Sequence, residues 1–228
     1  MKKKNNKKIK IKYNRLILFI LILMFFLCII IYILNIRVTN IYVLNNENNE
    51  FFKDQQIIEM AGLSDYPKII NLKRGKIKKV LEENVFIKSA DVKLKNFSKI
   101  YIDLTINYPL FYYKTDEKTV LYDGTKIDDF YNYPEVINYI PNLKYEEFLK
   151  KIRLVDRDIL AKISQIKYDP SDYDDERFLL YMDDDNLVYI TLYKFTNINK
   201  YNEIVKNFGN KRGIIYLDSG NYFEIKEN

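Results

Sequence analysis

Residues 89–107, SADVKLKNFSKIYIDLTIN, decide the fold, because they contain two segments in which apolar and polar residues alternate. The apolar positions of the second segment are Ile100, Ile102, Leu104 and Ile106. Those of the first segment are Ala90, Val92 and Leu94. A period of two is typical of a β-strand with one buried face, and the short FSK between the segments predicts a hairpin.

Two helical patterns come before this hairpin, in residues 51–63 and 71–84. Asp54 and Asn71 are the residues we expect as N-caps, and Gly62 can take the left-handed position that ends the first helix. A short strand pattern, IYVLNN, precedes both helices from Ile41. The order strand, helix, helix, strand, strand predicts an α+β unit in which two helices cover one face of a three-stranded sheet.

The chain after Pro109 is richer in strand patterns, and it ends in a strand over residues 213–220. Asp123-Gly124 predicts a turn, and a polar turn at residues 183–186 predicts a second hairpin. Asn197 is the expected cap of a helix that ends at Gly209. The other expected elements are strands over 110–115 and 119–127, a loop over 131–141 and one or two short helices over 144–163.

A long apolar run comes before the first strand. The nineteen residues from Leu16 to Leu34 include no charge, no amide and no proline. As a helix they span about 28 Å, close to the ~30 Å of hydrocarbon in a bilayer. A signal peptide has a shorter apolar region that ends at small residues, whereas this run exits through ILNIRV. The run therefore predicts an uncleaved transmembrane helix.

The charge distribution predicts the orientation of that helix. The first fifteen residues carry seven Lys, one Arg and no acid, whereas residues 16–228 carry 29 basic and 31 acidic residues. The positive-inside rule places such a basic flank in the cytoplasm and the bulk of the chain outside. Because the basic excess lies beside the membrane, the exterior part has no global basic field for nucleic acid.

Few residues suit catalysis or metal binding. The chain has no histidine, and its one cysteine, Cys28, lies within the apolar run. Eight acids gather between Asp169 and Asp185, but a calcium loop needs a central glycine that they lack. We interpret them as a solvated loop and a hairpin turn. A glycosidase pair stays open, since such carboxylates meet through the fold. No cofactor site or metal site is predicted.

The order of these parts resembles the bacterial division proteins FtsQ, called DivIB in Gram-positive bacteria. The resemblance rests on IYVLNNENNEFFKDQQIIEMAGL, on NVFIKSADVKLKNFSKIYIDLTINYPLFYY, on VLYDGTKI, on YIPNL and on NKYNEIVKNFGNKRGIIYLDSG. It implies an α+β fold with a single N-terminal transmembrane helix, a β-α-α-β-β POTRA domain and a strand-rich mixed α/β domain. The implied ranges are a cytoplasmic tail (1–15), a transmembrane helix (16–34), a POTRA domain (37–108), a β domain (109–221) and a C-terminal tail (222–228).

The resemblance also implies a function. Proteins of this family are not enzymes, and they hold FtsB/DivIC-type and FtsL-type partners beside the septal wall-synthesis machinery, in the cell membrane at the division septum. The family binds its FtsB-type partner by strand addition to the last strand, which we expect at a sheet edge. The implied partner-binding residues are Ile214, Ile215, Tyr216, Leu217, Tyr222 and Phe223.

Two alternatives remain. One is a membrane-anchored wall hydrolase that uses the acids of 169–185, and the other is a POTRA-bearing anchor in protein export. Alanine substitutions at Asp183, Asp184 and Asp185 would abolish wall cleavage by a hydrolase and leave a scaffold at the septum.

Overall fold

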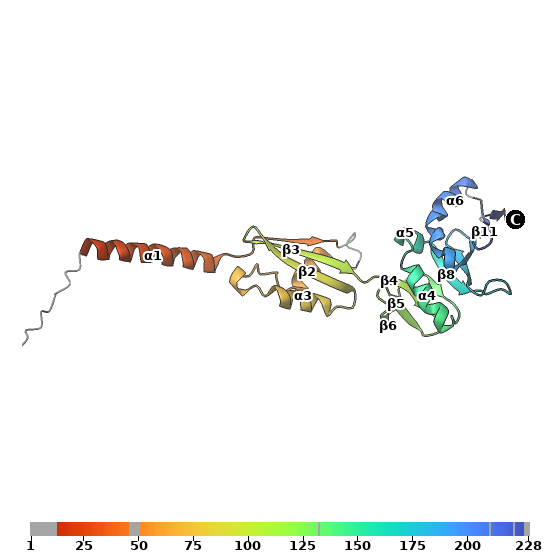
Figure 1. Ribbon diagram of the computed structural model, residues 1–228, viewed down its shortest axis with the longest axis horizontal. Coiled ribbons are helices and arrows are strands. Elements are labelled where there is room, and N and C mark those ends of the chain that lie inside the picture. Colours follow the sequence, from red (N-terminus) through yellow and green to blue (C-terminus); the bar gives the residue numbers. More distant parts are fainter. Residues whose placement is uncertain (1–12, 46–50, 132, 210, 221, 226–228) are drawn as a thin grey trace, which may run out of the picture. The chain divides into compact units, whose positions relative to one another are not determined.

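The computed structural model describes residues 13–45, 51–131, 133–209, 211–220 and 222–225. Most of the predicted cytoplasmic tail, residues 1–12, lies outside these ranges, as do residues 226–228. The chain separates into two compact units, with the division between Ile106 and Asn107 (Figure 1). The sequence places this division two residues later, before Pro109.

Helix α1 (Tyr13–Asn35) contains the whole predicted transmembrane run. Its side chains are exposed from Leu16 to Leu34. Among the described residues, α1 is the one helix that is long and apolar enough to cross a membrane. Exposure of so many apolar side chains is costly in water and favourable in hydrocarbon.

The rest of the first unit is a three-stranded sheet with two helices. Its elements are β1 (Asn40–Leu44), α2 (Asp54–Met60), the 3₁₀ turn η2 (Ile69–Asn71), α3 (Arg74–Glu82), β2 (Ile87–Lys95) and β3 (Lys99–Ile106). The strand order is β1-β3-β2, with β1 parallel and β2 antiparallel to β3. Figure 1 shows α3 against one face of this sheet. The predicted β-α-α-β-β order is confirmed.

Strand β3 is central in this sheet, and its alternation is confirmed. Ile100, Ile102 and Leu104 are at most 2% exposed, whereas the residues that alternate with them are half-buried or exposed. Ile57 of α2 and Ile77 and Leu81 of α3 are buried as well, and α3 packs on the neighbouring strand β2. The apolar face of β3 is thus the centre of the core of this unit.

Both predicted N-caps in this unit are wrong, and the terminator at Gly62 is confirmed. Helix α2 has Lys53 as its N-cap, because the Gln56 side chain accepts a hydrogen bond from the Lys53 N–H at 2.8 Å. Asp54 is instead the first helical residue, where its charge favours the helix dipole. Asn71 ends η2, and α3 begins three residues later. Gly62 has φ +66°, the left-handed conformation expected of it.

The second unit is built on one mixed sheet. Its elements are β4 (Pro109–Tyr113), β5 (Lys118–Leu121), β6 (Lys126–Ile127), β7 (Glu135–Val136), α4 (Asn142–Ile152), α5 (Arg157–Leu160), β8 (Ile163–Tyr168), β9 (Arg177–Met182), β10 (Leu187–Thr191), the 3₁₀ helix η3 (Leu192–Lys200), α6 (Tyr201–Asn207), β11 (Gly213–Tyr216) and β12 (Tyr222–Ile225). In the described part of the unit, nine strands follow the order β12-β11-β10-β9-β8-β7-β4-β5-β6.

Four phenylalanines form the centre of the core in this unit. Phe111, Phe148, Phe178 and Phe195 are all fully buried. The rings of Phe148 and Phe178 stack with their centroids 5.1 Å apart, which joins α4 to β9. Phe195 meets both rings edge-on and joins η3 to the same cluster. Burial of aromatic rings at these spacings is a strong packing contribution.

Several sequence predictions for this unit need correction. The predicted loop over 131–141 contains β7, whose two residues are too few to show alternation. Ile163 begins β8 and does not extend a helix. Residues 192–200 are a 3₁₀ helix, so Asn197 lies inside it and caps nothing. The predicted tail contains β12, because Tyr222–Ile225 pair with β11. The turns at Gly124 and Gly209, both with positive φ, are confirmed.

Truncation of Leu104 tests the core of the first unit. We expect Leu104→Ala to lower the free energy of unfolding by about 2–5 kcal/mol, because it leaves a cavity under two helices. The neighbouring exposed residue gives the control, Thr105→Ala, which should change it by less than about 0.5 kcal/mol. Urea unfolding in detergent micelles, followed by circular dichroism, measures both. Equal effects of the two variants would contradict the assigned register.

Candidate partner-binding edge

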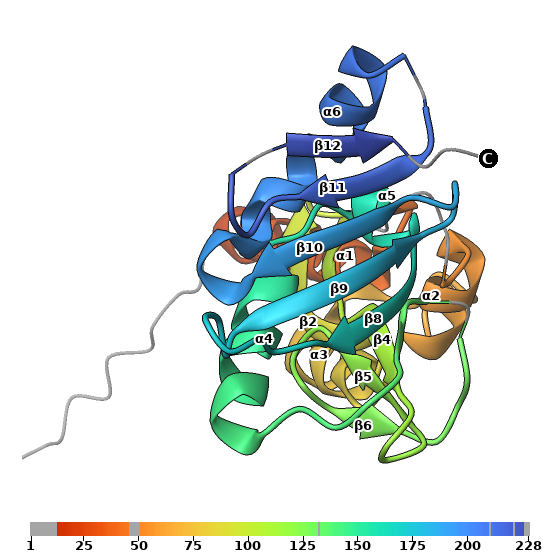
Figure 2. The same cartoon turned by 90° about the vertical axis from the view of Figure 1, so that its right-hand side faces the viewer.

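The outermost strand on one side of the larger sheet is β12, as Figure 2 shows. Strand β11 pairs in parallel with β10 on one side and in antiparallel with β12 on the other. The sequence places β11 at the edge, and the structure contradicts this. Four further residues, Tyr222–Ile225, pair with β11 and take the edge position. Within the described residues no strand pairs with the outer side of β12.

The six residues implied by the resemblance divide between the two faces of this sheet. Ile215 and Leu217 are 1% and 3% exposed and belong to the core of the second unit. Ile214 and Tyr216 alternate with them and are half-buried on the outer face. Of the six, Tyr222 is the one exposed side chain, at 50%. Three of these residues, Ile215, Leu217 and Phe223, therefore serve mainly to hold the edge in place.

On the outer face, aromatic rings form a row that ends at β12. The rings of Tyr189 on β10, Tyr216 on β11 and Tyr222 on β12 stack with centroids 5.4 Å and 4.3 Å apart. The Arg177 guanidinium lies 4.7 Å over the other side of Tyr189. This tyrosine row is continuous across three strands, and its last ring is open to solvent.

One hydrogen bond holds the tyrosine row to the edge strand. The Tyr216 hydroxyl donates to the Glu224 carboxylate at 3.1 Å. The pKa of Tyr216 is raised above its ordinary value, with burial as the largest cause and this carboxylate as the next. Glu224 lies opposite Ile214, two pairs away from Tyr216 and Tyr222. This contact therefore links two cross-strand pairs of β11 and β12 that lie on the same face of the sheet.

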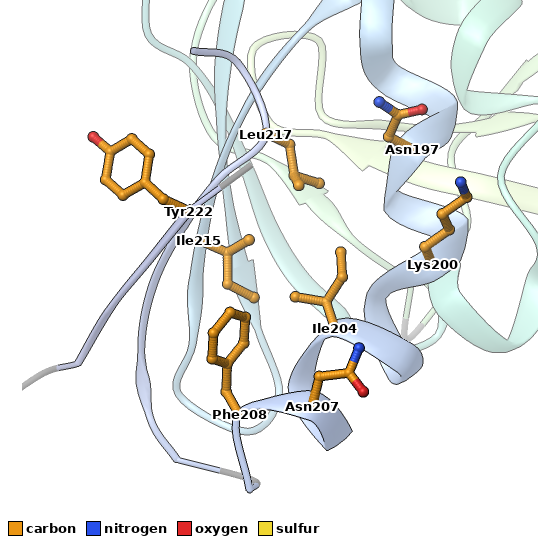
Figure 3. A pocket seen from close by; sticks show the side chains of 8 residues that line it. All are labelled: Asn197, Lys200, Ile204, Asn207, Phe208, Ile215, Leu217 and Tyr222. Carbon is orange, nitrogen blue, oxygen red and sulfur yellow. The ribbon is translucent and has the colours of Figure 1, made fainter. Parts of the chain in front are cut away.

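On the other face, a groove of about 240 Å³ runs between α6 and β11. Figure 3 shows Ile204, Phe208, Ile215 and Leu217 pointing into it, whereas the ring of Tyr222 points away. Polar groups of Asn197, Lys200 and Asn207 lie along its rim. The groove is therefore apolar at its floor and polar at its margin, a common form of a binding groove.

Phe223 of β12 packs on Phe208, one of the residues that line this groove. Its ring stacks on that of Phe208 at a centroid distance of 4.6 Å. The ring also lies over Gly213, where a Cβ would come within 2.8 Å of the Phe223 ring and 2.1 Å of the Glu224 carbonyl oxygen. Any side chain at position 213 would push β12 away, so this glycine allows the close approach of the edge strand.

A buried amide positions the start of β11. Asn186, which is 2% exposed, accepts a hydrogen bond from the Gly213 N–H at 2.7 Å. Its amide nitrogen donates to the Tyr201 hydroxyl at 3.0 Å, and that hydroxyl contacts the Asp184 carboxylate at 2.7 Å and 2.9 Å. Burial and the Asp184 carboxylate raise the pKa of Tyr201. The network ties the β9–β10 turn, α6 and β11 together.

The predicted interpretation of the acids as turn residues agrees with their contacts. Asp184 accepts from Tyr201, and Asp185, with φ +67°, pairs with Arg212 at 2.9 Å. Asp169 forms a salt bridge with Arg177 at 2.9 Å. No group of three or more potential ligands that could hold a metal ion exists among the described residues.

Three features of the edge are missing from the sequence-based site. Strand β12 is short and lacks clear alternation, because only Phe223 of its four side chains packs on the core. Ile204 and Phe208 could be found from the helical apolar stripe, but nothing in the sequence pairs that stripe with β11. The role of Asn186 depends on segments 15 and 27 residues away along the chain.

Comparison with known proteins assigns the class. Residues 44–105 match the model of the POTRA domain, FtsQ-type, which covers most of the first unit outside α1. The chain is 26% identical to the cell division protein DivIB of Bacillus subtilis over 226 residues, covering 94% of this chain and 85% of the relative. It is 25% identical to DivIB of Listeria monocytogenes over 186 residues, covering 77% of this chain and 69% of the relative.

A solved structure is also similar to part of the chain. The major extracytoplasmic domain of the cell division protein DivIB from Geobacillus stearothermophilus, as its trans isomer, matches with a TM-score of 0.39 and 16% identity. The match covers 46% of this chain and 97% of the solved one. From the sequence matches, this is a division protein with an FtsQ-type POTRA domain. The chain belongs to the FtsQ/DivIB family.

Substitution of Asn186 tests the network that positions β11. We expect Asn186→Ala to lower the free energy of unfolding by about 1–3 kcal/mol, because it leaves the buried Gly213 N–H without a partner. Asn142, exposed at the start of α4, gives the matched control, Asn142→Ala, with an expected change under about 0.5 kcal/mol. Urea unfolding followed by tyrosine fluorescence measures both. A change as small as that of the control would show that the network is dispensable.

Proposed function

We propose that this protein is a non-enzymatic, single-pass membrane scaffold of the bacterial division machinery. It binds FtsB/DivIC-type and FtsL-type partners outside the cytoplasm and supports septum formation beside the wall-synthesis enzymes. Membership of the FtsQ/DivIB family supports the division role. The observation that supports partner binding is the open outer side of β12.

In this proposal α1 is the membrane anchor, and residues 1–15 lie in the cytoplasm. The helix ends within one residue of the predicted apolar run on its C-terminal side. Its N-terminal flank carries eight basic residues and no acid, which favours retention in the cytoplasm. Both folded units then lie outside, where the division septum is built.

Strand addition to β12 explains how a partner is held. An edge strand presents backbone N–H and C=O groups that a second chain can pair with. Tyr222 and Ile225 are each 50% exposed, so neither side chain blocks the approach to this edge. Native proteins usually protect such edges with lysine or proline, and β12 contains neither.

The two faces of β12 define what the added strand should carry. Its residues opposite Phe223 and Ile225 would lie on the groove side, where apolar side chains meet Phe223 and the floor of the groove. Its residue opposite Tyr222 would extend the tyrosine row on the outer face. Cross-strand aromatic and β-branched pairs are favourable at both positions. A strand with apolar or aromatic residues on both faces is the expected partner segment.

The contacts of the acids weigh against the hydrolase alternative. Asp184 is engaged by a buried tyrosine and Asp185 by Arg212, and their side chains serve the β9–β10 turn. Asp169 is likewise paired with Arg177 at 2.9 Å. This supports the scaffold over the wall hydrolase.

A charge placed on the open edge tests the proposed binding site. We expect Ile225→Lys to weaken capture of the DivIC-type partner of the same organism about ten-fold or more, which is ~1.4 kcal/mol, because an edge lysine opposes strand addition. Leu143, 89% exposed on α4, gives the control variant Leu143→Lys. Co-purification of the two full-length proteins in detergent, with titration, measures the affinity. Equal affinities of the two variants for the partner would mean that the partner binds at another site.

A further inference from the structure

The end of α1 is hydrogen-bonded directly to a loop of the POTRA domain. The Lys68 ammonium donates to the Asn35 side chain at 2.7 Å, and the Ile69 N–H donates to the Ile36 carbonyl at 2.9 Å. The Val38 N–H donates to the Pro67 carbonyl at 3.0 Å. No spacer separates the helix from this loop, so residues 66–72 lie at the level where α1 ends.

The β2–β3 turn lies at the same end of the domain. The Thr39 N–H donates to the Ser98 carbonyl at 2.9 Å, and the two hydroxyls are 3.0 Å apart. Thr39 lies four residues after Asn35, the last residue of α1, a distance of at most about 14 Å along the chain. Strand β1 then pairs with β3 from Asn40 opposite Lys99. Two loops, 66–72 and 96–98, thus flank the point where the chain leaves α1.

Each loop exposes large apolar side chains. Phe97 is 85% exposed, Ile70 is 60% exposed and Tyr66 is 44% exposed. Phe97 and Tyr66 also have φ of +60° and +48°, a conformation that is unusual for bulky residues. Such a conformation costs of order 1–3 kcal/mol and often marks a functional position. Neither ring packs in the core, so no core packing offsets this cost. Contact with water alone therefore does not account for a bulky residue at either position.

The charges around these side chains are mostly positive. Arg37, Lys73, Arg74 and Lys99 are exposed or half-buried there, and Lys68 lies between Tyr66 and Ile70. Within the described residues, none of these five forms an ion pair with a carboxylate. Two acids lie nearby: Asp65 directly precedes Tyr66, and Asp91 lines a shallow hollow together with Arg74. The end of the domain beside α1 therefore combines apolar side chains with an excess of cations.

We propose that Tyr66, Ile70 and Phe97, with Arg37, Lys68, Lys73, Arg74 and Lys99, form a surface that docks on anionic lipid in the leaflet through which α1 leaves the membrane. This rests on the proposed anchor. The polar region of each leaflet is about 5–8 Å thick, which is within reach of both loops. Aromatic and aliphatic side chains enter the interface there, and cations bind the headgroups.

Docking has a consequence for the scaffold. A single helix lets an attached domain rotate and tilt, whereas two loops on either side of the helix give three points of contact with the bilayer. The lipid surface then fixes how the POTRA domain stands on the membrane. The bilayer acts as a structural partner of this domain in addition to holding α1.

The chain has no tryptophan, so a single introduced tryptophan reports its own surroundings. We suggest Phe97→Trp and Ile70→Trp in the full-length chain, in nanodiscs of phosphatidylglycerol and phosphatidylcholine with brominated acyl chains. Leu44→Trp is the control, because Leu44 is 41% exposed at the far end of β1, about 13 Å from Asn40. Phe25→Trp, in the middle of α1, reports the anchor itself.

We expect the bromolipid to quench Phe97→Trp and Ile70→Trp about two-fold or more relative to Leu44→Trp, with blue-shifted emission. This difference should shrink in discs of phosphatidylcholine alone. Quenching of Phe25→Trp with solvent-like emission of Phe97→Trp and Ile70→Trp would overturn the docking surface and leave the anchor standing. Solvent-like emission of Phe25→Trp would overturn the anchor, and the docking surface with it. Equal quenching in both lipid mixtures would overturn the part assigned to the cations.

Discussion

The hydrogen bond from the Gly213 N–H to the buried Asn186 side chain holds the C-terminal part of the sheet together. Asn186 is among the few polar residues buried in the described chain, and each of its side-chain groups is engaged. An unpaired amide at this depth would cost more free energy than the hydrogen bond itself contributes. The three segments that share the hydrogen bonds of Asn186, which are the β9–β10 turn, α6 and β11, are therefore held in one arrangement. β11 starts at this bond, and the strand beyond it depends on where β11 lies.

The position of β11 decides what is left open. Strand β10 pairs with one side of it, and β12 with the other, so the unpaired backbone of the sheet falls on β12. Gly213 lets β12 approach closely enough for Phe223 to stack on Phe208, which lines the apolar groove. On the opposite face the same pairing stacks Tyr222 on Tyr216. The groove, the tyrosine row and the open edge are thus three results of one strand register.

Much of the first unit could be predicted from sequence, because its signals are local. The alternation of Ile100, Ile102 and Leu104 names the buried face without any knowledge of the fold, and Gly62 marks a helix end by its own backbone. The N-caps failed because they depend on competition among neighbours. Gln56 reaches back to the backbone at Lys53, and Asp54 joins the helix instead.

The candidate site is harder to predict, because its parts meet only through long-range pairing. Ile215 and Leu217 are apolar and alternate, so a core role and a binding role fit the sequence equally well, and the structure gives them the core role. Of the four side chains of β12, one packs on the core, so the strand shows little alternation of apolar and polar residues. Its identity as the edge follows from the Asn186 bond and the close approach at Gly213, which no local window contains.

Amide hydrogen exchange measures backbone pairing on β12 without altering a side chain. The full-length chain is compared alone and with its DivIC-type partner bound, in detergent. We expect the β12 amides that point away from β11 to exchange at least about ten-fold more slowly in the complex, because the added strand accepts their hydrogen bonds. Unchanged exchange across Tyr222–Ile225 with the partner bound would contradict this pairing.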